Sequence, residues 1–181
     1  MQHRLGILVF LLITLGYRSA SADGAWGRIH GDVSIQGDIG IGMDNRKTAL
    51  AANLATRYLQ TAGLYTTWMV PLQHNTTYHY TVSFGLELRP LFLPRFLTNR
   101  QSTSPRLSMT IDSLALRMGV VTADNNPYRA TPGFETGFSI GIPLLQNVSG
   151  PWINASSTWR WPHDTMLTNR ESMFVWTITF G

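Results

Sequence analysis

Two histidines of this chain have carboxylates placed where they could orient an imidazole for acid–base chemistry. His30 and Asp32 are two residues apart, so an extended strand would put both side chains on one face. His79 is distant in the sequence from Glu135 and Asp38, but strands that share an interior could bring it beside either of them. A histidine held by a carboxylate is the usual arrangement of a general base and its orienting group. His30, Asp32, His79 and Glu135 are therefore candidate catalytic residues. A structural role as interior side chains explains the same pattern, and we favour it.

A serine motif in the second half of the chain matches a hydrolase pattern but lies in the wrong context. Gly137-Phe138-Ser139-Ile140-Gly141 fits Gly-x-Ser-x-Gly, in which the serine stands at a turn between a strand and a helix. Here the motif lies inside an alternating segment that ends at Pro143, so we predict that Ser139 is not a nucleophile. The chain has no cysteine and its five histidines are widely separated, so no metal site and no cofactor are predicted.

Alternation of apolar and polar residues is the main pattern of the sequence. In residues 29–43 the odd positions are mostly isoleucine, valine, glycine and methionine, and the even positions are polar or glycine. Residues 78–88 and 134–142 repeat the pattern, and the last strand places Phe174, Trp176 and Ile178 on one face. A period of two indicates β-strands with one apolar face and one polar face.

The composition narrows the class of protein. Charged residues make up 13% of the chain, against about 25% in an average soluble domain. After residue 22, however, no apolar run reaches the length of about 18 residues expected of a membrane-spanning helix. Low charge without such a run is typical of a transmembrane β-barrel, whose apolar residues occupy every second position. The net charge of +4 is small and scattered, so no nucleic-acid partner is predicted.

The first 22 residues have the three parts of a secretory signal peptide. A basic start precedes an apolar run at residues 5–15, and the Ala-Ser-Ala triplet at residues 20–22 supplies the small residues of a cleavage site. We therefore expect residues 1–22 to be a signal peptide and residues 23–181 to form a single domain.

The last strand, which ends in Phe180, resembles the C-terminal signal by which bacterial outer-membrane β-barrel proteins reach their assembly machinery. Gly181 is a departure from the usual terminal phenylalanine. The resemblance implies an all-β fold, a transmembrane antiparallel up-and-down β-barrel, in the bacterial outer membrane. Outer-membrane lipids and the assembly machinery are the implied partners. A secreted soluble β-sandwich or a lipocalin-like barrel is the alternative fold.

About eight strands follow from the alternating segments: residues 26–43, 47–60, 62–70, 78–90, 107–121, 133–143, 152–161 and 172–180. An even number puts both ends of the chain at the periplasmic end of the barrel. The alanine-rich stretch 49–55 could instead be helical, and Asp112 falls on the lipid-facing side of its predicted strand. Residues 90–106 are too long for a periplasmic turn, and their apolar residues and arginines favour a short segment along the membrane interface.

The polar faces of the strands carry charged residues that would fill the barrel. An eight-stranded barrel is just wide enough for side chains to fill its interior, and buried charges need partners of opposite sign. The charged residues predicted to lie inside include Arg28, Arg57, Glu87, Arg89, Arg117 and Arg160. Their positions along the strands predict two groups. The periplasmic group is Arg28, His30, Asp32, Arg57, Glu87 and Arg89, and the outer group is Asp38, His79, Arg117, Glu135 and Arg160.

Aromatic residues near the strand ends are expected to form girdles at the two membrane surfaces. They are Trp26, Trp68, Tyr78, Tyr80, Trp159, Trp161 and Phe180. The predicted function is a non-enzymatic component of the cell envelope with exposed loops. The alternatives are a lipid-modifying outer-membrane enzyme that uses one of the two histidine pairs, and a narrow porin-like pore for small solutes. The sequence leaves the oligomeric state open.

Overall fold

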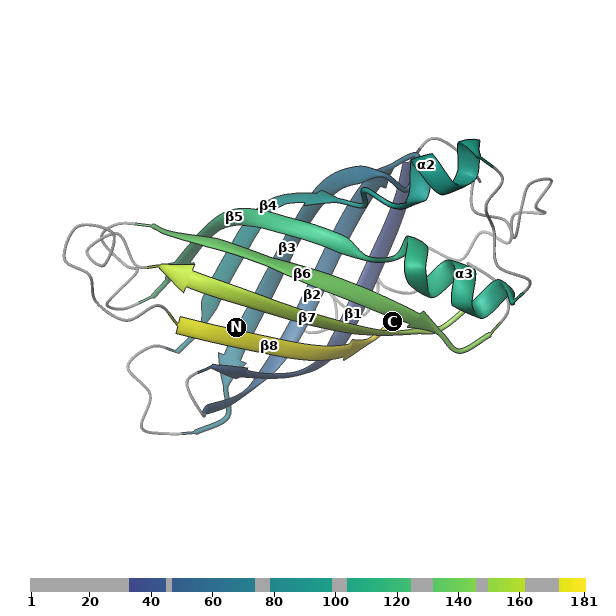
Figure 1. Cartoon of the computed structure of the whole chain (residues 1–181). Coiled ribbons are helices and arrows are strands. Elements are labelled where there is room, and N and C mark those ends of the chain that lie inside the picture. Colours follow the sequence, from purple (N-terminus) through teal and green to yellow (C-terminus); the bar gives the residue numbers. More distant parts are fainter. Residues whose placement is uncertain are drawn as a thin grey trace.

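The structure, a computed structural model, describes residues 33–44, 47–73, 79–98, 104–124, 132–145, 150–161 and 173–181. Within them, eight antiparallel strands form one closed barrel, in which each strand pairs with its neighbours in the chain and the last pairs with the first (Figure 1). The strands are β1 (Val33–Asp44), β2 (Lys47–Tyr58), β3 (Ala62–Pro71), β4 (Thr81–Leu88), β5 (Ala115–Ala123), β6 (Gly133–Pro143), β7 (Trp152–Trp161) and β8 (Met173–Phe180). The predicted all-β, eight-stranded up-and-down barrel is confirmed.

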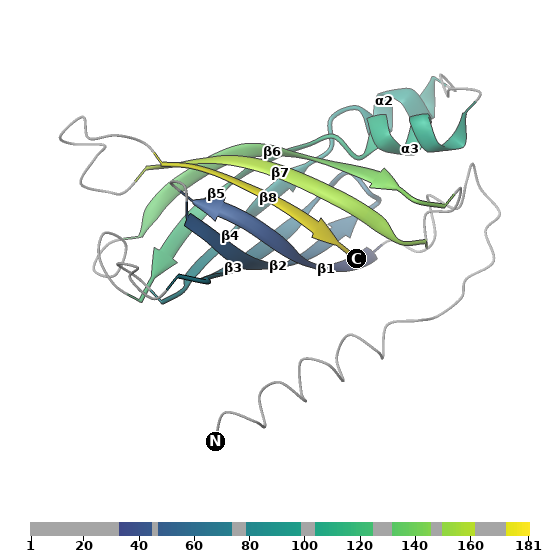
Figure 2. The ribbon, with the colours of Figure 1, turned by 90° about the horizontal axis from the view of Figure 1, so that it is seen from below.

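The two ends of the barrel differ. At the end that we call the helix end lie a short turn at residues 59–61, the helices α2 (Phe92–Leu97) and α3 (Pro105–Asp112), and the C-terminus (Figure 2). At the opposite end, which we call the loop end, β1, β3, β5 and β7 end and β2, β4, β6 and β8 begin, on the left in Figure 1. Neither helix of the described residues is long and apolar enough to cross a membrane.

The expected start of the fifth strand was wrong, and the structure decides between strand and helix for residues 49–55. The predicted strand 107–121 starts at Ala115, because the residues before it form α3, which begins at Pro105 and is followed by Ser113. Proline suits the first turn of a helix because its missing N–H has no helical partner there. Asp112 is therefore a helix residue that forms an ion pair with Arg95, not a lipid-facing strand residue. The alanine-rich stretch 49–55 lies in β2, which is paired on both sides.

The strand register fixes the tilt of the strands. The directly paired residues run once around the barrel through Val33, Tyr58, Ala62, Leu88, Leu116, Phe138, Ser157, Trp176 and Met43. This path leaves β1 at Val33 and returns at Met43, a shift of ten residues (43 − 33). With a rise of ~3.3 Å per residue and strands ~4.8 Å apart, such a shift tilts the strands by about 41° from the barrel axis.

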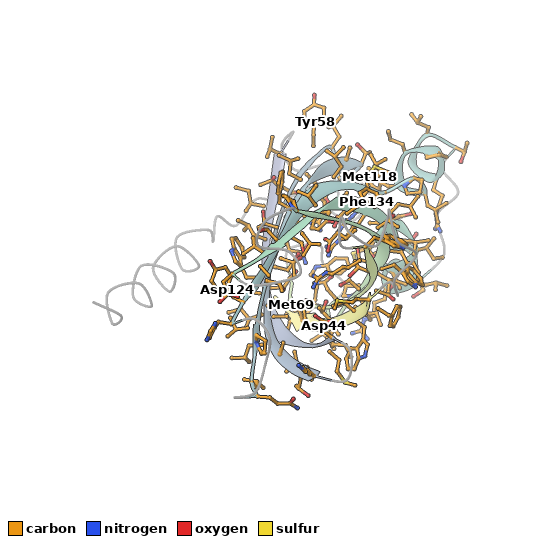
Figure 3. All side chains as sticks on the ribbon, turned by 90° about the vertical axis from the view of Figure 1, so that its left-hand side faces the viewer. Asp44, Tyr58, Met69, Met118, Asp124 and Phe134 are labelled. Atoms are coloured by element: carbon orange, nitrogen blue, oxygen red, sulfur yellow. The ribbon has the colours of Figure 1, made fainter. Side chains whose placement is uncertain are left out.

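The distribution of apolar residues is the reverse of that in a soluble domain. The outward apolar side chains are exposed on every strand, among them Ile35, Ile39, Leu54, Leu64, Phe84, Leu86, Leu116, Met118, Phe138, Ile142, Ile153, Ile178 and Phe180. Buried inward residues are mostly polar or charged, with small apolar clusters at the loop end around Met69 and Val121. Figure 3, seen from the loop end, shows Tyr58 projecting away from the barrel and Met69 inside it.

Candidate functional site: the charged interior of the barrel

Glu87 is the centre of a buried group of arginines at the helix-end half of the barrel. Its Oε1 lies 2.6 Å from Nε of Arg57 and 3.5 Å from Nε of Arg89. Its Oε2 accepts hydrogen bonds from Nε of Arg117 at 2.8 Å, and lies 2.7 Å from NH2 of Arg117. The Glu87 side chain is 1% exposed. We call Arg57, Glu87, Arg89 and Arg117 the Glu87 cluster, in which one carboxylate binds three guanidinium groups.

The register explains how these side chains meet. Glu87 and Arg117 are directly paired on β4 and β5, whereas Arg57 on β2 is one strand further away, beyond β3. The residue of β3 paired with both Arg57 and Glu87 is Gly63. A Cβ atom at Gly63 would lie 1.9 Å from a backbone oxygen of β2, so the sheet is closely packed there. Without a side chain, Gly63 leaves space for Arg57 to reach Glu87.

A second group surrounds Glu135 at the loop-end half. Its Oε2 accepts hydrogen bonds from Nε of Arg160 at 2.9 Å and from the hydroxyl of Ser83 at 2.9 Å. Its Oε1 accepts a hydrogen bond from the Tyr65 hydroxyl at 2.7 Å. Arg160 NH2 also donates to the Ser83 hydroxyl at 3.0 Å. We call Tyr65, Ser83, Glu135 and Arg160 the Glu135 cluster.

Tyr65 reaches Glu135 across two intervening strands. The paired residues from β3 to β6 are Tyr65, Gly85, Gly119 and Glu135. A Cβ atom at Gly119 would lie 2.8 Å from the Tyr65 hydroxyl oxygen. Because neither glycine has a side chain, the Tyr65 side chain can cross β4 and β5 to reach Glu135. The same rule holds as at Gly63: a glycine between two interacting residues lets a long side chain cross a strand.

Amide side chains extend the network around Asp38. Its carboxylate accepts hydrogen bonds from Gln36 at 3.0 Å, from Asn53 at 2.9 Å and from Asn154 at 2.9 Å. Gln36 in turn accepts a hydrogen bond from NH1 of Arg57 at 2.7 Å. Asp38 is therefore linked to the Glu87 cluster through one glutamine.

The two clusters meet at Tyr65. The Arg117 guanidinium carbon lies 4.8 Å from the centre of the Tyr65 ring, within range of a cation–π interaction. A cavity of about 10 Å³ remains between Asp38, Arg57, Arg89, Arg117 and other polar residues, which is enough for about one water molecule. In the part of the chain that the structure describes, ion-paired and hydrogen-bonded side chains occupy both halves of the interior.

The structure places the sequence-predicted interior charges as follows. Arg57, Glu87, Arg117 and Arg160 are buried, and the Arg89 side chain is 13% exposed. The predicted heights were wrong for Arg117 and Asp38. Both were expected at the outer end, but Arg117 binds Glu87 and Asp38 is linked to Arg57. Arg28 lies outside the described residues.

The candidate catalytic pairs are not formed where the structure describes them. His79 was expected in the interior, but its side chain is 88% exposed at the loop end, where Nδ1 lies 2.7 Å from Oδ2 of Asp124. Glu135 is 1% exposed and binds Arg160, so it does not orient His79. His30 and Asp32 lie outside the described residues.

Asp124 holds the start of β4 to the end of β5. Its Oδ1 accepts hydrogen bonds from the backbone N–H groups of His79 at 2.8 Å and Tyr80 at 3.3 Å. Desolvation opposes ionisation of Asp124, but these N–H groups and the His79 ring outweigh it and lower the pKa of the carboxyl group below its ordinary value.

Other candidate motifs have structural explanations in this fold. Ser139 lies inside β6, which continues to Pro143 without turning into a helix, so the hydrolase geometry is not present. Among the described residues, no group of three His, Cys, Asp or Glu side chains could hold a metal ion.

Several outward aromatic residues gather on β6, β7 and β8. The ring centre of Trp159 lies 5.9 Å from that of Phe138 and 5.3 Å from that of Phe174. The ring centres of Phe134 and Trp161 are 5.9 Å apart. Trp68 and Tyr80 are exposed toward the loop end, and Phe180 toward the helix end. Trp26 and Tyr78, also expected in the girdles, lie outside the described residues.

The sequence did not identify the uncharged members of the network as partners of the interior charges: Gln36, Asn53, Tyr65, Ser83 and Asn154. Alternation alone gives their inward side. For Tyr65, Gly85 and Gly119 were the signal that could have identified its partner, because each marks a strand that a long side chain can cross.

Glu87 is held by three arginines, and Glu135 by Arg160, Tyr65 and Ser83, so the interior contains a network of ion pairs and hydrogen bonds. Comparison with family models, with curated proteins and with solved structures finds no match to this chain.

Proposed function

We propose that this chain is an integral β-barrel protein of a bacterial outer membrane, a non-enzymatic envelope component whose barrel is a rigid scaffold for the connections at its loop end. One observation carries the proposal: exposed apolar side chains surround the barrel, while arginines and carboxylates lie inside it. Large apolar surfaces that face water are rare in soluble proteins. In a lipid environment these apolar side chains are not exposed to water. The closed sheet also satisfies its backbone hydrogen bonds internally, as lipid requires.

The height of the barrel supports this proposal. The strands β3 and β7 are each ten residues long, which corresponds to ~33 Å of strand. At a tilt of about 41°, this length extends about 25 Å along the barrel axis. The apolar band of outer-membrane barrels is also about 25 Å tall.

The filled interior favours a scaffold over a pore. The Glu87 and Glu135 clusters occupy the two halves of the barrel, and the cavity beside the first has room for about one water molecule. Solutes would have to break several ion pairs to pass. The separation of His79 from Glu135 likewise gives no support to an acyl-transfer enzyme built on that pair. Under the proposal the helix end faces the periplasm and the four connections at the loop end face outward, where they contact lipid headgroups or external partners.

Electrophoresis without boiling tests the membrane barrel. A closed barrel has no free edge from which SDS can unravel it, so protein folded in detergent or lipid should migrate differently before and after boiling. The protein should also remain in the membrane pellet after an alkaline wash. Identical migration of both samples, together with release into the aqueous fraction, would refute the proposal.

Two further measurements separate the scaffold from its alternatives. In planar bilayers the folded protein should give no steady conductance steps, and regular steps would support a pore instead. Incubation with outer-membrane lipids, followed by mass spectrometry of their acyl chains, should show no turnover. Turnover that is lost in His79→Ala or His30→Ala would establish an enzyme.

A further inference from the structure

The helices α2 and α3 lie outside the strand pairing of the barrel, beyond the helix ends of β4, β5 and β6 (Figures 1 and 2). Phe92 and Met109 are buried, at 3% and 2% exposure. Four leucines on and around the helices are exposed: Leu91, Leu93, Leu97 and Leu107. Leu97 is 76% exposed, more than any other large apolar side chain described. The helices thus present an apolar surface to their surroundings.

Specific contacts hold the two helices in place beside the barrel. The Ser113 hydroxyl, just after α3, donates to the Gly141 carbonyl at 2.8 Å and accepts from the Gly141 N–H at 2.8 Å. Nε of Arg95 in α2 lies 3.1 Å from Oδ1 of Asp112 in α3, and NH2 of Arg95 donates to the Ser108 hydroxyl at 3.1 Å. The first contact attaches α3 to β6, and the second attaches α2 to α3.

Exposed apolar residues also lie at the ends of the strands that the helices adjoin. At the helix ends of the adjacent strands, Leu88, Leu116 and Ile142 are about half exposed on the outside. Leu145, just beyond β6, is 53% exposed. Exposed apolar residues are therefore present both on the helices and at the adjacent end of the surface that the proposed function assigns to lipid.

The charge of this segment complements a phosphate-bearing surface. Between Glu87 and Asp112 the sequence has four arginines, at positions 89, 95, 100 and 106, and no acidic residue. Arg89 and Arg95 are used in ion pairs with those two flanking carboxylates, whereas Arg106 is exposed. Apolar residues with basic neighbours are typical of helices that lie in the interface of a membrane with anionic lipids.

We propose that α2 and α3 form an interfacial foot, which inserts Leu93, Leu97 and Leu107 among the lipid headgroups at the helix end of the barrel and binds lipid phosphate through Arg106. This proposal rests on the proposed function, because it requires the barrel to span a bilayer. It adds a lipid-binding surface that fixes the position of the barrel relative to one leaflet of the bilayer.

Single-cysteine labelling can test the foot, because the chain has no cysteine of its own. Leu97→Cys and Leu107→Cys carry a bimane label in protein reconstituted into phosphatidylglycerol vesicles. Lipids brominated at shallow or deep acyl positions quench a label in the bilayer, and iodide quenches one in water. Phe84→Cys on the barrel wall serves as the lipid-facing control, and Gln73→Cys at the loop end serves as the water-facing control. Each labelled protein must keep its boiling-dependent migration.

The expected result is a loss of fluorescence at positions 97 and 107 with shallow bromines and little loss with iodide. If both positions respond to iodide as position 73 does, while position 84 is quenched by bromolipid, the foot is refuted, the barrel stays in the bilayer, and a protein partner becomes the occupant to seek. If position 84 is not quenched by bromolipid either, the proposed function itself fails. In phosphatidylcholine vesicles the quenching at position 97 should weaken. Arg106→Gln should remove this dependence on lipid charge, and quenching that ignores both changes would refute the phosphate contact.

Discussion

Replacement of Glu87 by alanine should destabilise the barrel more than any neutral interior change. The substitution leaves Arg57, Arg89 and Arg117 in the interior without their shared carboxylate. Three contacts of 2.6 to 2.8 Å disappear, and charge-assisted hydrogen bonds contribute about 1.5–3 kcal/mol each. Their sum is an upper limit, because the contacts share one group. Loss of one partner from a buried ion pair costs about 3–5 kcal/mol, and we expect a loss of that size.

Equilibrium unfolding in urea measures this effect. The protein is folded into lipid vesicles, and the tryptophan fluorescence and the unboiled electrophoretic band follow the transition. Ser139→Ala is the matched control, because it removes a neutral hydroxyl from the same interior and should change the free energy of unfolding little. Arg117→Met added to Glu87→Ala should restore part of the loss, because one uncompensated charge is removed. A free energy of unfolding for Glu87→Ala that equals the Ser139→Ala value would refute the buried cluster.

Three other changes test separate contacts. Tyr65→Phe removes the hydroxyl bonded to Glu135, so a urea titration should show a loss of about 1.5–3 kcal/mol in the free energy of unfolding. The pKa of Asp124 is lowered in the folded protein, so its stabilising contact with His79 is complete above about pH 4 and is lost as the pH falls through the folded-state pKa. The NMR shift of the His79 amide proton should follow that loss. Ser113→Ala removes the two bonds to β6, so protease should cut residues 90–112 faster while the barrel stays resistant to SDS.

Each of these changes has its own control. Tyr58→Phe, on the outside of β2, should leave stability unchanged, and an effect equal to that of Tyr65→Phe would contradict the interior contact. Asp124→Asn should abolish the acid titration of the His79 amide, and an unaltered titration would assign it to another group. Ser104→Ala, at the N-cap position of α3, where the side chain makes no capping hydrogen bond, should not speed proteolysis to the same extent.

The alternation of the sequence predicted the barrel, because successive side chains of a strand point to opposite faces. One face meets the polar interior and the other the apolar outside, so the residue types alternate with a period of two. The prediction failed at residues 107–112, where Leu107, Met109 and Ile111 alternate with polar residues although the segment forms α3. Over two helical turns, such a short run fits either structure, and Pro105 was the better indication of its type. His79 was placed inside by the same parity, but it precedes the first residue of β4, where parity no longer fixes a side.

The partners inside the barrel could not be predicted from strand positions alone. Arg117 was assigned to the outer end from its distance along β5, yet it binds Glu87 in the helix-end half of the barrel. The ten-residue shift of the register is the reason, because it raises each strand relative to the one before it. Equal distances from strand ends are therefore unequal heights in the barrel, and the sequence does not contain the shift.

The hydrogen bonds of Asp38 constrain the order in which the strands of this barrel assemble. Asp38 accepts hydrogen bonds from β2 and from β7, and the second of these joins residues 116 positions apart in the chain. That bond can form only when β1 has met β8, and contacts of such long range form slowly. Until then the Asp38 carboxylate of an unfinished sheet would lack its bond from Asn154 and would be open to the lipid of the proposed membrane setting, where a charge without its partners is costly. We therefore expect the pairing of β1 with β8 and entry into the bilayer to occur together. A barrel that lacks its last strand would be unstable both in water and in lipid.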